Sequence, residues 1–309
     1  MNRHIFTLLR PHQWLKNVFV FMPLFFDRHA TDWCYVWPCT VAFVAFCLTA
    51  SGVYCFNDIH DAASDRQHPV KRMRPVASGS VSKPTAYTLM CILWVAAFTL
   101  LTFCCPITPH TTLTSPHSPL TSYHSPLTSY LLLIYIILNL AYSVKLKQIA
   151  LLDVFIIATG FVLRIMVGGQ SAGIALSHWI VLTTFLLALF LALAKRRDDA
   201  VIHQSSGSIL RKNITRYSLE FLDLSIAMLG GVTIVCYVLY TVSDEVVART
   251  GSQHLYATSV FVLAGILRYM QLTFVDRRSG SPTKVLLHDH FIHLCIAGWI
   301  AAFAIILYT

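Results

Sequence analysis

Three of the fourteen acidic residues lie within eight positions of one another, at Asp58, Asp61 and Asp65, and Asn57 directly precedes them. They follow an apolar stretch, and at about 100° per helical residue the four side chains share one face of a helix. Carboxylates packed in this way repel one another, and a hard cation relieves that repulsion. Mg²⁺ prefers a few carboxylates together with phosphate oxygens of a substrate. The spacing therefore predicts a Mg²⁺ site formed by Asn57, Asp58, Asp61 and Asp65.

The residues after this cluster are rich in cations and contain two prolines. Pro69 and Pro75 are expected to break the helix, which leaves Lys71, Arg72 and Arg74 on a loop beside the acidic face. Carboxylates for a metal next to fixed cations suit a metal-bound diphosphate. The alternative is an ordinary loop whose charges pair, but pairing alone does not require four oxygen-bearing side chains on one face. We predict catalytic roles for Asp58, Asp61, Lys71 and Arg74, and substrate binding by Asp65, His68 and Arg72.

The composition indicates which elements must position these residues. Of the 309 residues, 56% are hydrophobic and 12% are charged, and the charged share is about half that of a soluble domain. A helix needs about 20 apolar residues to cross a bilayer. We predict an all-helical integral membrane protein with a single polytopic domain over residues 1–309. Its nine expected spans are 14–26, 36–57, 85–105, 129–143, 149–172, 176–194, 221–242, 256–275 and 290–308.

The basic residues predict the orientation of these spans. Lys and Arg exceed Asp and Glu by 23 to 14. With the N-terminus in the cytoplasm, 19 of the 23 cations fall in inside segments, and Arg28 and Arg249 fall outside. This asymmetry is a strong positive-inside signal, so we expect the N-terminus and the site to face the cytoplasm. In a membrane protein such an excess indicates loops, anionic lipid or phosphorylated ligands, and no nucleic-acid partner is expected.

One outside segment is unusual. Residues 110–130 read HTTLTSP, HSPLTSY and HSPLTSY, and their density of Pro, Ser and Thr predicts an irregular loop over residues 107–130. His110, His117 and His124 recur every seven residues, so metal binding is conceivable, but a tolerated loop insertion is the favoured interpretation. The nine cysteines include no Cys-x-x-Cys pair and are expected to pack as small apolar residues.

The motifs resemble a known family. Asn57-Asp58-x-x-Asp61-x-x-x-Asp65 resembles the first aspartate-rich motif of the UbiA-type membrane prenyltransferase superfamily. Within it, the decaprenyl-phosphate phosphoribosyltransferases are most similar, over roughly residues 5–105 and 130–295. The stretches that carry this similarity are Leu9–Asn17, Asp65–Gly79, Gly160–Gly169 and Ser281–Asp289.

The resemblance implies a nine-helix bundle with Mg²⁺ bound at the cytoplasmic side of a bacterial inner membrane. It implies transfer of the 5-phosphoribosyl group from phosphoribosyl diphosphate to a polyprenyl (decaprenyl) phosphate, with release of diphosphate, for cell wall biosynthesis. Membrane lipid surrounds such a protein, and a homo-oligomer is possible. The alternative is a UbiA-type enzyme that moves a polyprenyl group onto an aromatic or quinone-precursor acceptor. A transporter or channel is disfavoured, because only Arg164 and Arg268 lie well within apolar spans.

Further positions are candidates for substrate binding. Arg164 lies inside the fifth span, where a cation costs at least about 2.5 kcal/mol, so it either holds an anionic substrate group or pairs with another helix. Lys145 and Lys147 either hold an additional phosphate or form a plain cytoplasmic loop, and the same alternatives apply to Lys195 and Arg196. The complete set of these further substrate-binding candidates is Arg10, Gln13, Lys16, Asn17, Tyr142, Lys145, Lys147, Arg164, Lys195 and Arg196.

Overall fold

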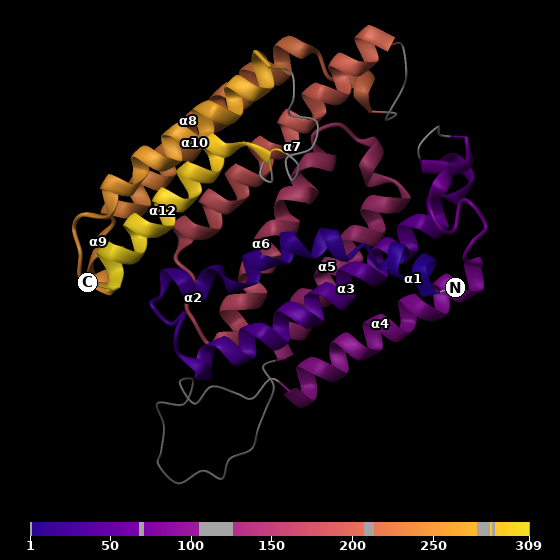
Figure 1. Ribbon diagram of the computed structural model, residues 1–309, viewed down its shortest axis with the longest axis horizontal. Helices are drawn as coiled ribbons and strands as arrows, with labels where there is room; N and C mark the ends of the chain where they lie inside the picture. Colours follow the sequence, from indigo (N-terminus) through magenta and orange to yellow (C-terminus); the bar gives the residue numbers. More distant parts are fainter. Residues whose placement is uncertain are drawn as a thin grey trace. The chain divides into compact units, whose positions relative to one another are not determined.

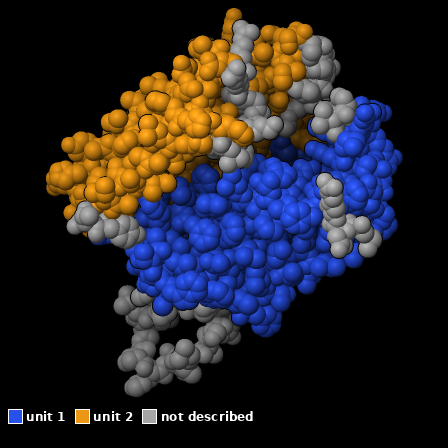
Figure 2. All heavy atoms as spheres, in the orientation of Figure 1, with its two compact units in different colours: residues 1–146, 163–176 blue, residues 147–162, 177–309 orange. Residues whose placement is uncertain are grey.

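The computed structural model describes residues 2–67, 71–104, 126–206, 213–276, 285 and 288–308 (Figure 1). All regular secondary structure in these residues is helical, which confirms the prediction of an all-helical chain. The chain forms two compact units, coloured separately in Figure 2. Unit 1 comprises residues 1–146 and 163–176, and unit 2 comprises residues 147–162 and 177–309. The prediction of one polytopic domain over residues 1–309 stays a prediction.

Eight helices among the described residues are long and apolar enough to cross a membrane. They coincide with the second to ninth predicted spans. The first predicted span, 14–26, instead forms the 3-10 helix η1 (Pro11–Phe21) followed by the five-residue helix α2 (Met22–Phe26). The total of nine spans therefore stays a prediction.

The boundary of the predicted irregular loop was wrong at its C-terminal end. Residues 126–130 belong to helix α5 (Pro126–Val144). Proline is tolerated in the first turn of a helix, where its missing N–H would have no intrahelical acceptor, so Pro126 begins the helix instead of excluding it. The three histidines of the repeat lie outside the described residues.

Unit 1 is built around the 34-residue helix α3 (Trp33–Arg66). The carboxylate of Asp32 caps its start by accepting from the backbone N–H of Cys34 at 3.0 Å. The helix ends three residues before Pro69, as the prolines predict. The helices η1, α1 (Asn2–Leu9), α4 (Lys83–Cys104) and α5 pack against it. Their core includes Val20, Phe46, Leu101, Leu132 and Leu163.

Unit 2 pairs α7 (His178–Ser206) with α8 (Leu219–Val242), and α10 (Ser259–Phe274) with α12 (His290–Tyr308). Its core includes Phe190, Leu222, Ile226 and Ile266. Helix α6 (Leu152–Ala172) contributes its first half to unit 2 and its second half to unit 1. Shorter elements of this unit are η5 (Ile214–Arg216), α9 (Asp244–Thr250) and η6 (Leu255–Thr258).

Candidate active site

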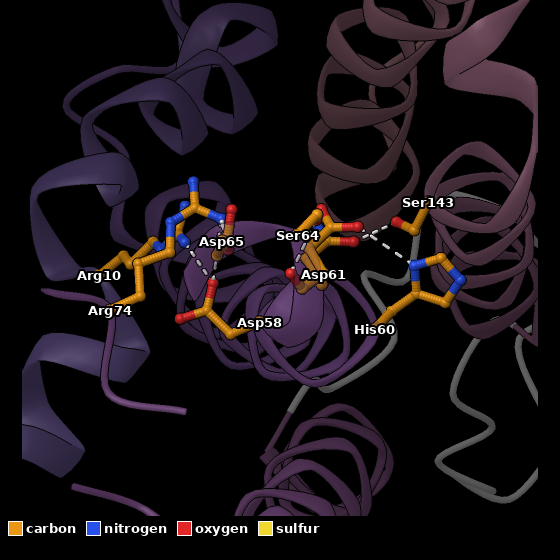
Figure 3. Close-up of polar contacts among 9 residues, drawn as sticks. Arg10, Asp58, His60, Asp61, Ser64, Asp65, Arg74 and Ser143 are labelled. Atoms are coloured by element: carbon orange, nitrogen blue, oxygen red, sulfur yellow. Dashed lines mark hydrogen bonds and ion pairs between the residues drawn. The ribbon is translucent and has the colours of Figure 1, made fainter. Parts of the chain in front are cut away.

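Two of the predicted carboxylates at the C-terminal end of α3 are paired with arginines (Figure 3). Arg10 Nη2 lies 2.5 Å from Asp58 Oδ1, and Arg74 Nη1 lies 2.7 Å from Asp65 Oδ2. Arg74 Nη1 is also 3.6 Å from Asp58 Oδ1, so it lies between the two acids. Asp58 is almost fully buried, at 1% exposure, and Asp65 is buried as well. Two buried negative charges are thus compensated by two guanidinium groups.

The segment after α3 folds back so that Arg74 reaches these acids. Arg66 Nε donates to the carbonyl oxygen of Ala77 at 3.0 Å, which ties the end of the helix to the returning chain. The backbone N–H of Arg74 donates to the carbonyl of Lys71 at 2.9 Å, closing the 3-10 turn η2 (Lys71–Met73). Gly79 then adopts a φ of +80°, a conformation that glycine reaches without steric cost. Arg74 is therefore held by a structured turn.

Arg10 precedes α3 in the sequence, whereas Arg74 follows it. It lies between α1 and η1 in the left-handed region, with φ 53° and ψ 56°. Its carbonyl accepts from the N–H of Gln13 at 2.8 Å, and its guanidinium carbon lies 5.1 Å from the ring centroid of Tyr54. Tyr54 and Asp58 are four residues apart on α3 and so neighbour each other on its surface. The side chain of Arg10 follows this stripe to the carboxylate.

The other two predicted ligands, Asn57 and Asp61, have different partners, and Figure 3 shows Asp61 away from the two arginines. The hydroxyl of Ser143, on α5, is within hydrogen-bonding distance of Asn57 Oδ1. The carboxylate of Asp61 lies 3.1 Å from His60 Nδ1, and the hydroxyl of Ser64 donates to the Asp61 carbonyl at 2.9 Å. Asp58 and Asp65 are therefore paired with arginines, whereas Asn57 and Asp61 contact polar side chains or their own helix.

The donor set suits Mg²⁺ in its chemistry. Among the described residues no three His, Cys, Asp or Glu side chains gather in a way that could hold a metal ion. Mg²⁺ does not require such a cluster, because it is usually bound by one or two carboxylates and completed by substrate phosphates and water. Asp58 Oδ2 is buried and has no hydrogen-bond partner within the described part of the chain. A buried carboxylate oxygen without a donor is an available ligand for a hard cation.

The remaining cations and polar residues predicted in this unit lie at the surface or partly buried. Arg72 and Lys145 are exposed, and the other four are half-buried; these are Gln13, Lys16, Lys71 and Tyr142. His68 lies outside the described residues. None of these placements by itself assigns a ligand.

Arg164 lies in a buried polar network with another predicted residue. Its Nε donates to Asn17 Oδ1 at 2.9 Å, and Asn17 Nδ2 donates to the sulfur of Cys47 at 3.2 Å. Arg164 Nη2 donates to the Tyr135 hydroxyl at 3.3 Å, and the guanidinium carbon lies 4.8 Å from the ring centroid of Phe46. Arg164 was predicted either to hold an anionic substrate group or to pair with another helix. These contacts favour the second interpretation, because they connect α6 to η1, α3 and α5.

A close backbone approach lies one turn further along α6. A Cβ atom added at Gly168 would lie against the carbonyl oxygen of Val20 and 2.8 Å from its carbonyl carbon. The thiol of Cys39 lies 3.4 Å from the carbonyl oxygen of Gly168. Glycine at this position lets η1 lie directly on α6.

Unit 2 contains a second charged cluster, which includes Arg196. This residue is fully buried, and it donates to Asp153 at 2.7 Å and to Asp199 at 2.9 Å. The hydroxyl of Tyr217 donates to Asp153 at 2.8 Å and accepts from the N–H of Leu151, whose φ is +67°. Burial raises the pKa of Tyr217 and keeps its hydroxyl protonated. The guanidinium of Arg196 is thus engaged by carboxylates, while the neighbouring Lys195 and the predicted Lys147 are half-buried.

Two residues of these networks were not found from the sequence. Ser143 contacts the predicted ligand Asn57, 86 positions away. Tyr217 contacts Asp153, 64 positions away, which is the partner of the predicted residue Arg196. A lone Ser near the end of an apolar span, and a lone Tyr before one, carry no local signal of such partners.

Comparisons with known proteins agree with this architecture. The sequence matches the UbiA prenyltransferase family over residues 18–294. It is 30% identical to a decaprenyl-phosphate phosphoribosyltransferase from Mycolicibacterium smegmatis, over 97% of this chain and 91% of the relative. It is also 30% identical to the enzyme of that name from Corynebacterium glutamicum, over 97% and 85% of the two chains.

The solved structures that are similar share the fold. A UbiA homolog from Archaeoglobus fulgidus, in a complex with GPP and Mg²⁺, has a TM-score of 0.66 and 16% identity and covers 99% of this chain and 100% of its own. A UbiA homolog from Aeropyrum pernix has a TM-score of 0.60 at 14% identity. The family match, the relatives and the fold lead to one conclusion: the chain belongs to the UbiA prenyltransferase family of integral membrane transferases.

Proposed function

We propose that this protein transfers the 5-phosphoribosyl group of phosphoribosyl diphosphate to a polyprenyl phosphate and releases diphosphate. The observation that carries the proposal is the similarity to decaprenyl-phosphate phosphoribosyltransferases over 97% of the chain. The paired acids and arginines at the end of α3 support it, because they provide carboxylates for a metal beside cations for a diphosphate.

The arginines have a defined role in this reaction. The bond between ribose C1 and the diphosphate oxygen breaks, and the electron pair leaves with the diphosphate. Arg10 and Arg74, with Lys71 and Arg72 on the adjoining turn, stabilise the negative charge that develops there. Guanidinium groups suit this task because they stay protonated and bind phosphate oxygens in pairs.

The lipid acceptor supplies the nucleophile. An oxygen of its phosphate is already anionic, so it forms the new bond to C1 without a strong base. Attack opposite the leaving group predicts inversion at C1. Asp58 and Asp61, with Asn57 and with Asp65 directly or through water, would hold Mg²⁺, whose role when bound is to neutralise charge on the leaving diphosphate.

We further propose that the enzyme lies in a bacterial inner membrane with this site facing the cytoplasm. The excess of Lys and Arg on one side of the predicted spans supports this orientation. A water-soluble diphosphate donor would reach the site from that side, and a polyprenyl acceptor would reach it from the surrounding lipid.

The alternative is a prenyl transfer from a polyprenyl diphosphate to an aromatic acceptor. Membranes that contain the protein are incubated with Mg²⁺ and either labelled phosphoribosyl diphosphate plus decaprenyl phosphate, or labelled polyprenyl diphosphate plus 4-hydroxybenzoate. Labelled lipid phosphoribose in the first mixture supports the proposal. Product in the second mixture alone refutes it and supports the alternative.

Two substitutions connect this activity to the site. We expect Asp58→Asn and Asp61→Asn to abolish transfer while the protein still inserts into the membrane. Asp244→Asn is the matched control, because Asp244 is exposed on α9 and lies in unit 2. Near-normal turnover of either site variant would contradict the assignment of these carboxylates.

A further inference from the structure

Asp58 has counter-ions supplied by its own chain. Its carboxylate is 1% exposed, and Arg10 Nη2 lies 2.5 Å from Oδ1, with Arg74 Nη1 at 3.6 Å. The second oxygen, Oδ2, is buried and accepts no hydrogen bond within the described part of the chain. The carboxylate is thus neutralised on one oxygen and has an unused acceptor on the other.

A divalent cation on this carboxylate would lie close to both guanidinium groups. Like charges at a few ångströms repel strongly where water is largely excluded. The repulsion disappears if an arginine turns from the carboxylate to a newly arrived anion. A diphosphate provides such an anion, because guanidinium groups form charge-assisted, often bidentate hydrogen bonds with phosphate as well as with carboxylate.

The two arginines differ in how readily they can change partners. Arg74 pairs with Asp65 at 2.7 Å in addition to Asp58, so it keeps a carboxylate in either state. Asp58 is the one acid with which Arg10 forms an ion pair in the described residues. Arg10 therefore loses its single pair when Asp58 takes another cation, and it is the residue that must find a new anion.

The backbone of Arg10 supports the same assignment. Its φ of 53° and ψ of 56° lie in the left-handed region, which residues other than glycine rarely adopt. Pro11 follows directly and further restricts the conformations of Arg10. Such outliers persist where the surrounding structure imposes them and are enriched at ligand clamps and switch regions. Here the unusual backbone directs the side chain along Tyr54 to Asp58.

From these contacts we infer that Arg10 is an exchangeable counter-ion of Asp58. Without a bound diphosphate, Arg10 pairs with the Asp58 carboxylate and weakens binding of a free divalent cation. When the cation arrives with a diphosphate, Arg10 moves to a phosphate oxygen and releases Asp58 to the metal. Metal and diphosphate then bind with positive coupling, each strengthening the other. The inference rests on the proposed function only in requiring a diphosphate ligand.

The test measures binding by the purified full-length protein in nanodiscs. Binding of Mn²⁺ alone is followed by electron paramagnetic resonance, and retention of labelled inorganic diphosphate is measured separately at a fixed excess of Mn²⁺. For Arg10→Gln we expect Mn²⁺ alone to bind about tenfold more tightly and the diphosphate about tenfold more weakly, within the usual range of coupling. Opposite shifts in the two assays are the signature of an exchanged counter-ion.

Two further variants act as controls. Arg28→Gln changes another arginine with a positive φ, 63°, that is exposed and outside the site, and it should leave both affinities unchanged. Arg10→Lys keeps the charge and should keep Mn²⁺ binding weak, which separates loss of the charge from loss of the fold. Affinities of Arg10→Gln that fall together, or that do not change, overturn the inference.

The result is independent of which group the diphosphate carries. If opposite shifts occur but no phosphoribose is transferred, the proposed function fails and the counter-ion exchange stands. If transfer occurs without opposite shifts, the exchange fails and the proposed function stands.

Discussion

Replacing Gly168 by alanine tests whether the position of η1 on α6 determines activity. An added Cβ would lie 2.8 Å from the carbonyl carbon of Val20 and closer still to its oxygen. The optimal separation between carbon atoms is about 3.5 Å, so the two backbones must separate by roughly 0.7 Å or more. No side-chain rotation relieves this contact, because the opposing atoms belong to the main chain.

The displacement reaches the candidate active site through η1. That helix begins immediately after Arg10, whose guanidinium is 2.5 Å from Asp58, and it carries Asn17, which accepts from Arg164. A misplacement of about 1 Å at a reacting centre can cost about 100-fold in rate. We therefore expect Gly168→Ala to lower kcat/KM for phosphoribosyl transfer by about 10- to 100-fold.

The assay is the labelled-donor transfer, with the amount of folded protein measured by gel filtration in detergent. Gly231→Ala is the matched control, because a Cβ there meets no atom within 4 Å and the residue lies in helix α8. The control should keep its activity. Unchanged activity of Gly168→Ala would refute the reasoning, since the close approach would then have no bearing on the site.

Two further predictions concern unit 2. Asp153→Asn should lower the free energy of unfolding by about 3 kcal/mol in an SDS titration, because it leaves the buried Arg196 with one fewer charged partner. Adding Arg196→Met to Asp153→Asn should recover most of this loss. Additive losses in the double variant would contradict the prediction. Asp289 has a pKa held below its usual value by hydrogen bonds from Arg268. Its contribution to stability is therefore present above the unfolded pKa of about 3.9 and is lost as the pH falls through the lower folded pKa. The difference in thermal unfolding between the wild type and Asp289→Asn should shrink on acidification, and a constant difference would count against the pair.

The membrane helices were predictable because their signal is local. Runs of apolar residues gave eight of the nine expected spans, since burial in lipid requires each helix to be apolar along its own length. The first predicted span does not form one long helix, and its interior is less apolar. Residues 14–26 include Lys16 and Asn17, and the segment forms the end of η1, which packs against α3, and the short helix α2, which packs against η1.

The partners of the charged residues were not predictable, because pairing depends on how distant helices pack. Arg10 meets Asp58 across 48 positions, and Arg164 meets Asn17 across 147. Helical spacing placed Asn57 and Asp61 at one edge of the acidic face and Asp58 and Asp65 at the other. It could not predict that Arg10 and Arg74 would form ion pairs with Asp58 and Asp65. Arg196 shows the same limit, since its carboxylate partner Asp153 lies 43 positions earlier.

The length of α3 has a consequence for where the two substrates meet. Its 34 residues span about 51 Å at 1.5 Å per residue, against about 30 Å for the hydrocarbon core of a bilayer. Asp58 lies 25 residues after Trp33, roughly 38 Å along the axis, and thus beyond the hydrocarbon if the helix enters near its first turn. The carboxylates then lie at the depth of the lipid headgroups, where the phosphate of a polyprenyl phosphate also lies. A lipid acceptor can react there without withdrawing its chain from the bilayer, and a soluble donor can arrive without entering it.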